Sequence, residues 1–197
     1  MIVAGITGGI GSGKTTICKT WEKLGAKIIY ADELAKKLMV NDMELRKKLI
    51  SAFGKETYKA DGKLNKTHLI KEAFEKNRVE ELNQIVHPAV AHKFSAICDD
   101  ERKAGTRLIV KEAALLLNYG RPENIEIVVL VLSEKKNQIE RVKQRDNSTA
   151  DDIEARMQKQ PDFNKLTHMA DYIIHNDGSL EELQEKAKNL YTKILQS

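Results

Sequence analysis

A glycine-rich segment near the N-terminus combines backbone freedom with a single positive charge. Residues 5–16 read GITGGIGSGKTT. Glycines occupy positions 8, 9, 11 and 13, and Lys14 directly follows the last of them. Glycines let the backbone curl until successive N–H groups point inward, and a Cβ would block either the curl or the close approach of a ligand. Backbone N–H groups and an ammonium are donors that suit phosphate oxygens, so the segment predicts a phosphate-binding loop.

The flanking residues place this loop between a strand and a helix. Residues 2–6 (IVAGI) are short and apolar, which predicts a buried strand, and the apolar residues after the loop recur at helical spacing. GGIGSGKT matches G-x-x-x-x-G-K-[ST] in the required context, which identifies a P-loop. ATP and Mg²⁺ are the expected cofactors: Lys14 reaches the β- and γ-phosphates and the Thr15 hydroxyl binds the metal. The predicted nucleotide-binding residues of the loop are Gly9, Gly11, Ser12, Gly13, Lys14, Thr15 and Thr16.

Four further segments resemble buried strands: residues 26–32, 107–113, 126–132 and 171–176. Short apolar runs that alternate with helical patterns are typical of a parallel sheet covered on both faces. The predicted fold is α/β, a P-loop NTPase-type three-layer sandwich with a central parallel sheet of about five strands. A capping box at Ser179 and Glu182 predicts the start of a final structural helix.

About 75 residues separate the second strand from the third, far more than an ordinary connection. Apolar residues between positions 34 and 53 recur at helical spacing, and Pro88 fits the first turn of a later helix. These patterns predict an inserted helical domain. The insertion either has no functional role or holds the substrate, and the second interpretation is favoured in so small an enzyme.

The remaining motifs favour one class of P-loop protein. The chain contains neither D-x-x-G nor N-K-x-D, which argues against a regulatory GTPase, and it is small for a motor or transporter ATPase. A short chain with an insertion after the second strand suggests a kinase that acts on a small molecule. A nucleotide-binding switch or scaffold without transfer activity is the non-enzymatic alternative.

A kinase also needs a group for the acceptor hydroxyl and cations for the transferred phosphoryl group. Asp32, at the predicted end of the second strand, is the candidate for the hydroxyl, with a helix N-cap as its alternative role. Glu112 ends the third strand, as either a functional acid or a strand-end charge. Arg141 and Arg145 lie four residues apart in RVKQRD, on one face of a predicted helix, and a solvated salt-bridged helix is the alternative there.

Along its full length the chain resembles the dephospho-CoA kinase family. The family's opening TGGIGSGK is present as Thr7 to Lys14, and the second Asp of its strand-two motif is Asp32. The later family motifs are matched, in the correct order, by Leu82, Ile85, His87, Pro88 and Val90, by RVKQRD, and by Ala170, Asp171, Ile174, Asn176, Gly178 and Ser179.

The resemblance implies ATP-dependent phosphorylation of the ribose 3′-hydroxyl of dephospho-CoA, the last step of coenzyme A biosynthesis. A P-loop kinase with a nucleoside-monophosphate or sugar acceptor is the alternative. The resemblance also implies a nucleotide-binding core (residues 1–31 and 106–197), a lid at about 133–165 and a helical CoA-binding insertion (32–105). The implied catalytic residues are Asp32, Lys14 and Arg141; Arg145 and Asn176 join the nucleotide site, and Thr7, Asp32, His87 and Glu112 the acceptor site.

Two departures separate this chain from the family pattern. Tyr30 replaces the first Asp of the strand-two pair, and Ala114 and Asn118 replace the Pro and Glu of the family's P-L-L-F-E block. An asparagine cannot act as a carboxylate. Glu33 or Glu112 is a candidate to compensate.

Composition limits the partners. The net charge of +4 selects no partner class, and the single Trp and the 5% aromatic content provide no stacking platform for nucleic acid. The longest apolar run, residues 127–132, is too short to span a bilayer, so neither a membrane nor a nucleic-acid partner is expected. Cys18 and Cys98 form no metal or disulfide pattern. We expect a cytoplasmic protein; its oligomeric state is open, and a monomer is plausible.

Overall fold

The structure, a computed structural model, describes residues 1–196, apart from the side chain of Phe74. Its strands are β1 (Ile2–Gly8), β2 (Lys27–Tyr30), β3 (Leu108–Glu112), β4 (Ile127–Leu132) and β5 (Tyr172–His175). Its helices are α1 (Lys14–Lys23), α2 (Ala31–Asn41), α3 (Met43–Phe53), η1 (Lys55–Thr57), α4 (Lys66–Leu69), η2 (Ile70–Glu75), α5 (Val79–Lys103), α6 (Lys135–Asp146), α7 (Ala150–Gln158), η3 (Phe163–Met169) and α8 (Leu180–Gln196).

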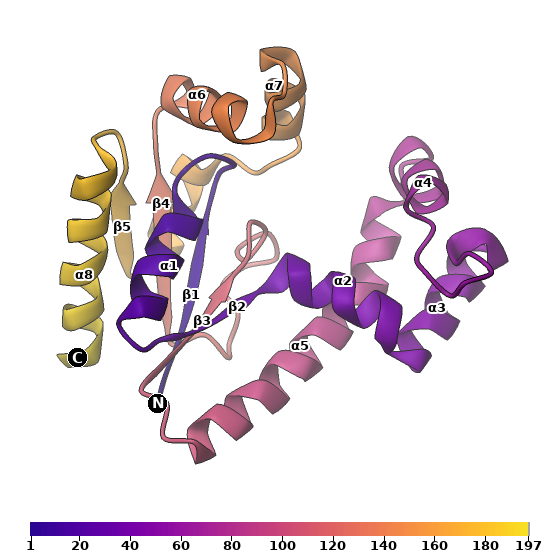
Figure 1. The fold of residues 1–197 in the computed structure, drawn as a ribbon, viewed down its shortest axis with the longest axis horizontal. Helices are drawn as coiled ribbons and strands as arrows, with labels where there is room; N and C mark the ends of the chain where they lie inside the picture. The colour runs from indigo at the N-terminus through magenta and orange to yellow at the C-terminus, as the bar shows by residue number, and fades with distance from the viewer. Residues whose placement is uncertain (197) are drawn as a thin grey trace. The chain divides into compact units, whose positions relative to one another are not determined.

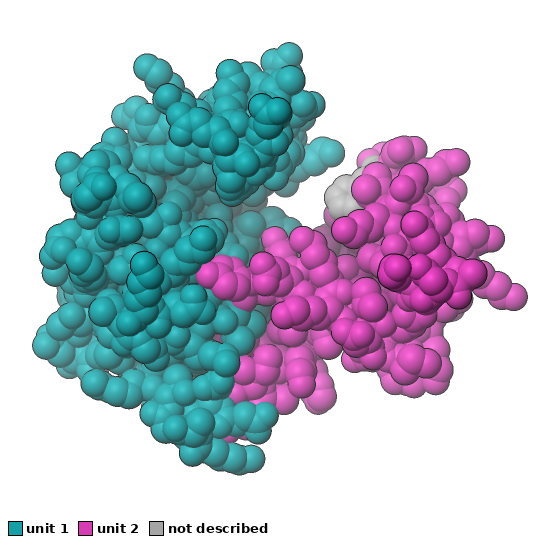
Figure 2. All heavy atoms as spheres, viewed as in Figure 1, with its two compact units in different colours: residues 1–29, 100–197 teal, residues 30–99 magenta. Residues whose placement is uncertain are grey.

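The chain divides into two compact units, which Figure 2 shows in different colours. Unit 1 comprises residues 1–29 and 100–197, of which the last lies outside the described residues, and unit 2 comprises residues 30–99. Across residues 1–196, no helix is both long and apolar enough to cross a membrane.

Unit 1 is built on a five-stranded sheet with the order β2-β3-β1-β4-β5 (Figure 1). β1 pairs in parallel with β3 on one side and β4 on the other, and β4 pairs in parallel with β5. The first three residues of β3 and the four central residues of β4 are buried, as expected for parallel strands covered on both faces. The α/β fold predicted from the apolar runs is confirmed, and all five predicted strands are present.

Helices α1 and α8 pack side by side (Figure 1), and Trp21 fixes their contact. The Trp21 side chain is fully buried, and its indole N–H donates to the carbonyl of Ala187, 2.7 Å away. The start of α8 has the predicted cap, because the Glu182 N–H donates to the Ser179 hydroxyl. Leu180, the first residue of α8, lies outside the core and is 55% exposed.

Unit 2 is helical and has a core of its own. Leu45, Leu49 and Phe53 of α3 are buried against Val86 and Val90 of α5, among others. The continuous helical pattern between positions 34 and 53 is divided, because the Asp42 carboxylate accepts from the N–H groups of Glu44 and Leu45 and so begins α3.

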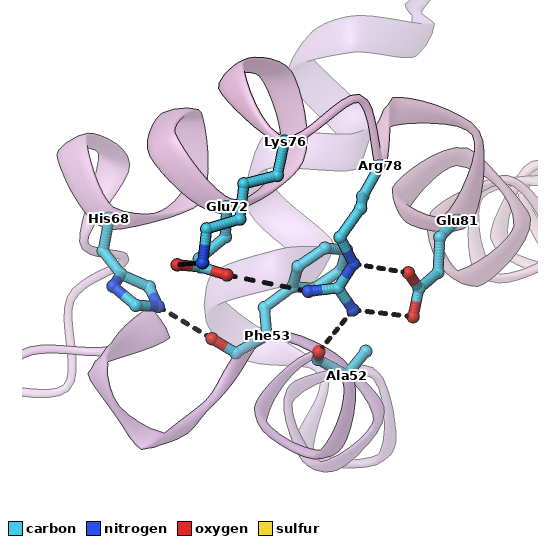
Figure 3. Close-up of polar contacts among 7 residues, drawn as sticks. All are labelled: Ala52, Phe53, His68, Glu72, Lys76, Arg78 and Glu81. Carbon is cyan, nitrogen blue, oxygen red and sulfur yellow. Dashed lines mark hydrogen bonds and ion pairs between the residues drawn. The ribbon is translucent and has the colours of Figure 1, made fainter.

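The C-terminus of α3 is closed by side chains from a later segment (Figure 3). The Arg78 guanidinium donates to the Ala52 carbonyl at 2.7 Å, and a ring nitrogen of His68 lies 2.7 Å from the Phe53 carbonyl. Arg78 is held in turn by Glu81 and stacks on the Phe53 ring, 4.6 Å from its centroid. The last carbonyls of a helix have no intrahelical donor, so these side chains satisfy groups that the helix leaves open.

Two predicted boundaries in this region are wrong. β2 ends at Tyr30, and Asp32 lies in the first turn of α2 rather than at the end of the strand or at the N-cap. Pro88 does not open a helix: it lies inside α5, which begins at Val79. A proline inside a helix removes one backbone hydrogen bond and is usually disfavoured there, which is why the sequence pattern predicted a helix start instead.

Candidate functional site

The glycine-rich loop joins β1 to α1 at the centre of the sheet. β1 ends at Gly8 and α1 begins at Lys14, with Gly13 as its N-cap in the left-handed conformation. Because β1 lies between β3 and β4, its C-terminal end is the point where the connections diverge to opposite sides of the sheet. Crevices at such points are the usual ligand sites of open α/β sheets.

Lys14 lies inside the loop rather than in solvent. Its side chain is 10% exposed, and its ammonium donates to the carbonyls of Gly8 and Gly9 at 2.9 and 3.0 Å. The Glu112 carboxylate, at the end of the neighbouring strand β3, is 3.9 Å away. The positive charge is therefore held at the centre of the loop by groups on both of its sides.

Two of the glycines are required by close packing. Gly11 and Gly13 have φ angles of 73° and 107°, which side-chain-bearing residues rarely adopt. A Cβ at Gly11 would lie 2.6 Å from the carbonyl oxygen of Gln138, and one at Gly13 would lie 2.3 Å from the Asn176 amide nitrogen. These glycines thus let α6 and the segment after β5 approach the loop.

The donors of the loop fit a phosphate group. The first N–H groups of α1 have no intrahelical acceptor, and the helix dipole adds positive potential at the same place. Among the described residues, the fully buried Ser12 hydroxyl has no hydrogen-bond partner. Thr15 is exposed at the start of α1, and Thr16 is half-buried behind it. Amides, a hydroxyl and a buried ammonium together form a site for an anion.

Arg141 and Asn176 lie against this loop. The Arg141 guanidinium donates to the Ser133 hydroxyl at 2.9 Å, to the Asn176 carbonyl at 3.0 Å and to the Gly11 carbonyl at 3.4 Å. The buried Asn176 side chain donates to the Ser12 carbonyl at 2.7 Å. Arg141, predicted from sequence as a catalytic residue, and Asn176, predicted as a nucleotide ligand, both contact the protein groups that shape the loop.

Arg145 does not share the environment of Arg141. Its guanidinium is exposed and pairs with Asp146 at 2.6 and 2.9 Å, and Arg156 of α7 donates to the same carboxylate at 3.1 Å. These hydrogen bonds hold the pKa of Asp146 well below its ordinary value. Sequence reasoning did not select Asp146, because an acid beside an arginine in a charged helix is common.

A pocket of about 560 Å³ opens beside the loop at the ends of β4 and β5. Its walls combine apolar, aromatic and polar side chains; the lining includes Leu132, Gln138, Met157, Pro161, Phe163, His175 and Asp177. The Asp177 carboxylate accepts from the Glu134 N–H at 2.7 Å and from Ser133, and these bonds, against the effect of burial, lower its pKa. Sequence reasoning missed this pocket, since its walls come from separate segments.

The other candidates selected from sequence are dispersed. Thr7 is fully buried and donates its hydroxyl to the Ala114 carbonyl, 3.2 Å away. Asp32 and His87 belong to unit 2, where both side chains are exposed, on α2 and α5. Asn118 is exposed after β3.

The buried thiol nearest the loop is not a nucleophile. Burial raises the pKa of Cys18 far above its ordinary value, and the negative charge of Glu112 adds to this effect. The thiol therefore stays protonated at neutral pH and packs as an apolar group.

Comparisons with known proteins agree on one family. Residues 1–182 match the family model of dephospho-CoA kinase. A dephospho-CoA kinase from Salinibacter ruber is 41% identical over 195 residues, which cover 98% of each chain. Among solved structures, TT1252 from Thermus thermophilus has a TM-score of 0.77 at 26% identity, covering 98% of this chain and 97% of that one. The dephospho-CoA kinase from Campylobacter jejuni has a TM-score of 0.65 at 24% identity, covering 99% and 98%.

Proposed function

This chain belongs to the dephospho-CoA kinase family, and we propose that it uses its P-loop and the adjacent residues to transfer the γ-phosphoryl group of ATP to dephospho-CoA. The product is coenzyme A, so the reaction is the last step of its biosynthesis. The observation that carries the proposal is the buried Lys14 ammonium inside the glycine loop. It occurs in a chain that is 41% identical to the Salinibacter ruber dephospho-CoA kinase over 98% of its length.

We assign the triphosphate of ATP to the loop and its base to the pocket beside it. The amides at the start of α1 and the Lys14 ammonium are donors for the phosphate oxygens. The pocket's apolar and aromatic lining, which includes Phe163 and His175, suits the faces of a purine ring. The Thr15 hydroxyl and the Glu112 carboxylate are oxygen groups of the kind that Mg²⁺ prefers, and Mg²⁺ would neutralise charge on the β- and γ-phosphates.

Asp32 is proposed as the residue that orients and deprotonates the acceptor. The ribose 3′-oxygen attacks the γ-phosphorus, its proton passes to the carboxylate, and the bond from the γ-phosphorus to the β,γ-bridging oxygen breaks to release ADP. An exposed carboxylate in the first turn of α2 is accessible for this role. His87, exposed on α5, is proposed to contact the same acceptor. Since both substrates are small metabolites, we expect the enzyme to work in the cytoplasm.

The test is a coupled assay of ADP release with several acceptors. We expect turnover with dephospho-CoA and none with AMP, CMP or shikimate, and mass spectrometry should find the added phosphate on the ribose 3′-oxygen. Turnover with a nucleoside monophosphate or a sugar-type acceptor, and not with dephospho-CoA, would show that the enzyme is a kinase with a different acceptor. ATP binding without any acceptor-dependent turnover would indicate a nucleotide-binding scaffold instead.

A further inference from the structure

Three consecutive residues at the tip of the P-loop are each held by a side chain from the C-terminal half of unit 1. The Ile10 N–H donates to the side-chain oxygen of Gln160 at 2.9 Å. The Gly11 carbonyl accepts from Arg141 at 3.4 Å, and the Ser12 carbonyl accepts from the Asn176 amide at 2.7 Å. We call Gln160, Arg141 and Asn176 the loop clamp.

The clamp residues come from three separate segments. Gln160 follows the end of α7 and is half-buried, Arg141 lies on α6, and Asn176 follows β5 with 4% of its surface exposed. No segment of the chain could place all three groups by local geometry. Their convergence on residues 10–12 is a property of the tertiary fold.

The orientation of the Asn176 amide is fixed on both of its sides. Its nitrogen donates to the Ser12 carbonyl, while its side-chain oxygen faces Arg141 at 3.5 Å, and its backbone carbonyl accepts from the same guanidinium. The side chain therefore serves as a donor to the loop. This use differs from the role of nucleotide ligand that the family resemblance implied for Asn176.

We propose that Gln160 and Asn176 are positioning residues, which act on the nucleotide by fixing the conformation of the P-loop. Gln160 also lines the pocket assigned to the base, so its test includes a measurement on the loop without nucleotide. A segment with glycines at positions 8, 9, 11 and 13 has many accessible conformations, and ordering it upon binding would weaken affinity. Bonds from outside the loop settle that conformation before the phosphates arrive. The inference rests on the proposed function, because it assumes that phosphates bind to this loop.

Gln160→Ala tests the first contact, with Gln158→Ala as the matched control, since Gln158 is exposed at the end of α7. Without nucleotide, we expect amide hydrogen exchange at Ile10 to become at least about threefold faster in Gln160→Ala and to stay unchanged in the control. We expect Gln160→Glu, which keeps an acceptor oxygen, to restore the protection of Ile10. In Gln160→Ala, the Kd for ADP and the KM for ATP should rise about two- to tenfold, the range for one lost hydrogen bond, with the KM for dephospho-CoA unchanged.

Asn176→Asp tests the second contact, with the same change at exposed Asn189 of α8 as the control. The substitution keeps the side-chain volume but places an oxygen against the Ser12 carbonyl, so we expect the Kd for ADP to rise about tenfold or more. If Asn176→Asp does not fold, Asn176→Ala removes the donor without adding a charge and is measured in its place. The control should bind ADP like the unaltered enzyme.

The outcomes separate positioning from direct contact. A weaker affinity for ADP in Gln160→Ala with unchanged exchange at Ile10 would show that Gln160 touches the nucleotide, and would overturn the proposal. Unchanged ADP affinity in Gln160→Ala or in the folded Asn176 variant would overturn it for that residue. If the unaltered enzyme itself neither binds ADP nor transfers phosphate, the proposed function fails, whereas the exchange measurement still reports on the contact with Ile10.

Discussion

Lys14 shows how one residue serves both the loop and its ligand. Its ammonium is almost fully buried and bonds two carbonyls of its own loop, so the loop itself holds the charge in position. Groups preorganised in this way stabilise developing charge without reorganisation during the reaction.

Lys14→Ala is expected to lower kcat by about 10²–10³-fold, since it removes a donor for the transferred phosphoryl group. Steady-state kinetics measures this loss, and circular dichroism checks that the fold is kept. Lys19→Ala, an exposed change on the same helix, is the matched control and should keep full activity. A Lys14→Ala enzyme that turns over normally would contradict the assigned role.

Asp32, in unit 2, is the residue proposed as the general base. We expect Asp32→Asn to reduce kcat by about 10²–10⁴-fold, the usual contribution of a general base, while ATP still binds. Kinetics with both substrates and calorimetry with ATP would measure the two effects. Glu33→Gln, the neighbouring exposed acid in α2, is the control. If Glu33→Gln is the inactive variant, then Glu33 supplies the base and Asp32 supports the first turn of α2.

At the scale of elements, α6 and α7 are joined through Asp146. Its carboxylate accepts from Arg145 of its own helix and from Arg156 of α7. Because these bonds lower the pKa of Asp146 below its ordinary value of 3.8, the carboxylate binds fewer protons in the folded state than in the unfolded chain near that pH. The stabilisation is therefore present above about pH 4 and is lost as the pH falls further.

Asp146→Asn should lower the Tm at pH 7, and the difference from the unaltered protein should shrink as the pH falls below about 4, because the unfolded chain then gains a proton at Asp146 that the folded protein does not bind. Thermal unfolding followed by circular dichroism at pH 7 and pH 3 measures both differences. Asp151→Asn, an exposed change in the first turn of α7, controls for the general effect of removing a carboxylate. An equal difference in Tm at the two pH values would show that the ion pairs do not hold the helices.

At the scale of the whole molecule, substrate binding should stabilise the folded chain. A ligand at 100 times its Kd adds about 2.7 kcal/mol to the free energy of unfolding. We therefore expect ATP and dephospho-CoA each to raise the Tm, which a thermal-shift titration measures. Lys14→Ala should lose most of the shift with ATP and keep the shift with dephospho-CoA. Loss of both shifts in this variant would mean that Lys14 supports the fold and not the nucleotide site.

The sequence alone determined the sheet, the P-loop and the family. The apolar runs predicted all five strands, and the glycines and Lys14 predicted the loop, because these signals depend on neighbouring residues. Three element boundaries differ from the predicted ones: the local cap at Asp42 divides a continuous helical pattern, Pro88 lies inside α5, and Asp32 follows β2 instead of ending it.

Only the tertiary structure decided how the loop is held. Arg141 and Arg145 are equivalent in the helical pattern, yet one bonds Ser133 and the P-loop while the other is exposed beside Asp146. No sequence pattern predicted that Gln160 contacts the P-loop, since a glutamine between a helix and a proline is common. Contacts between residues 150 positions apart follow from how the sheet brings strand ends together, and spacing along the chain does not encode them.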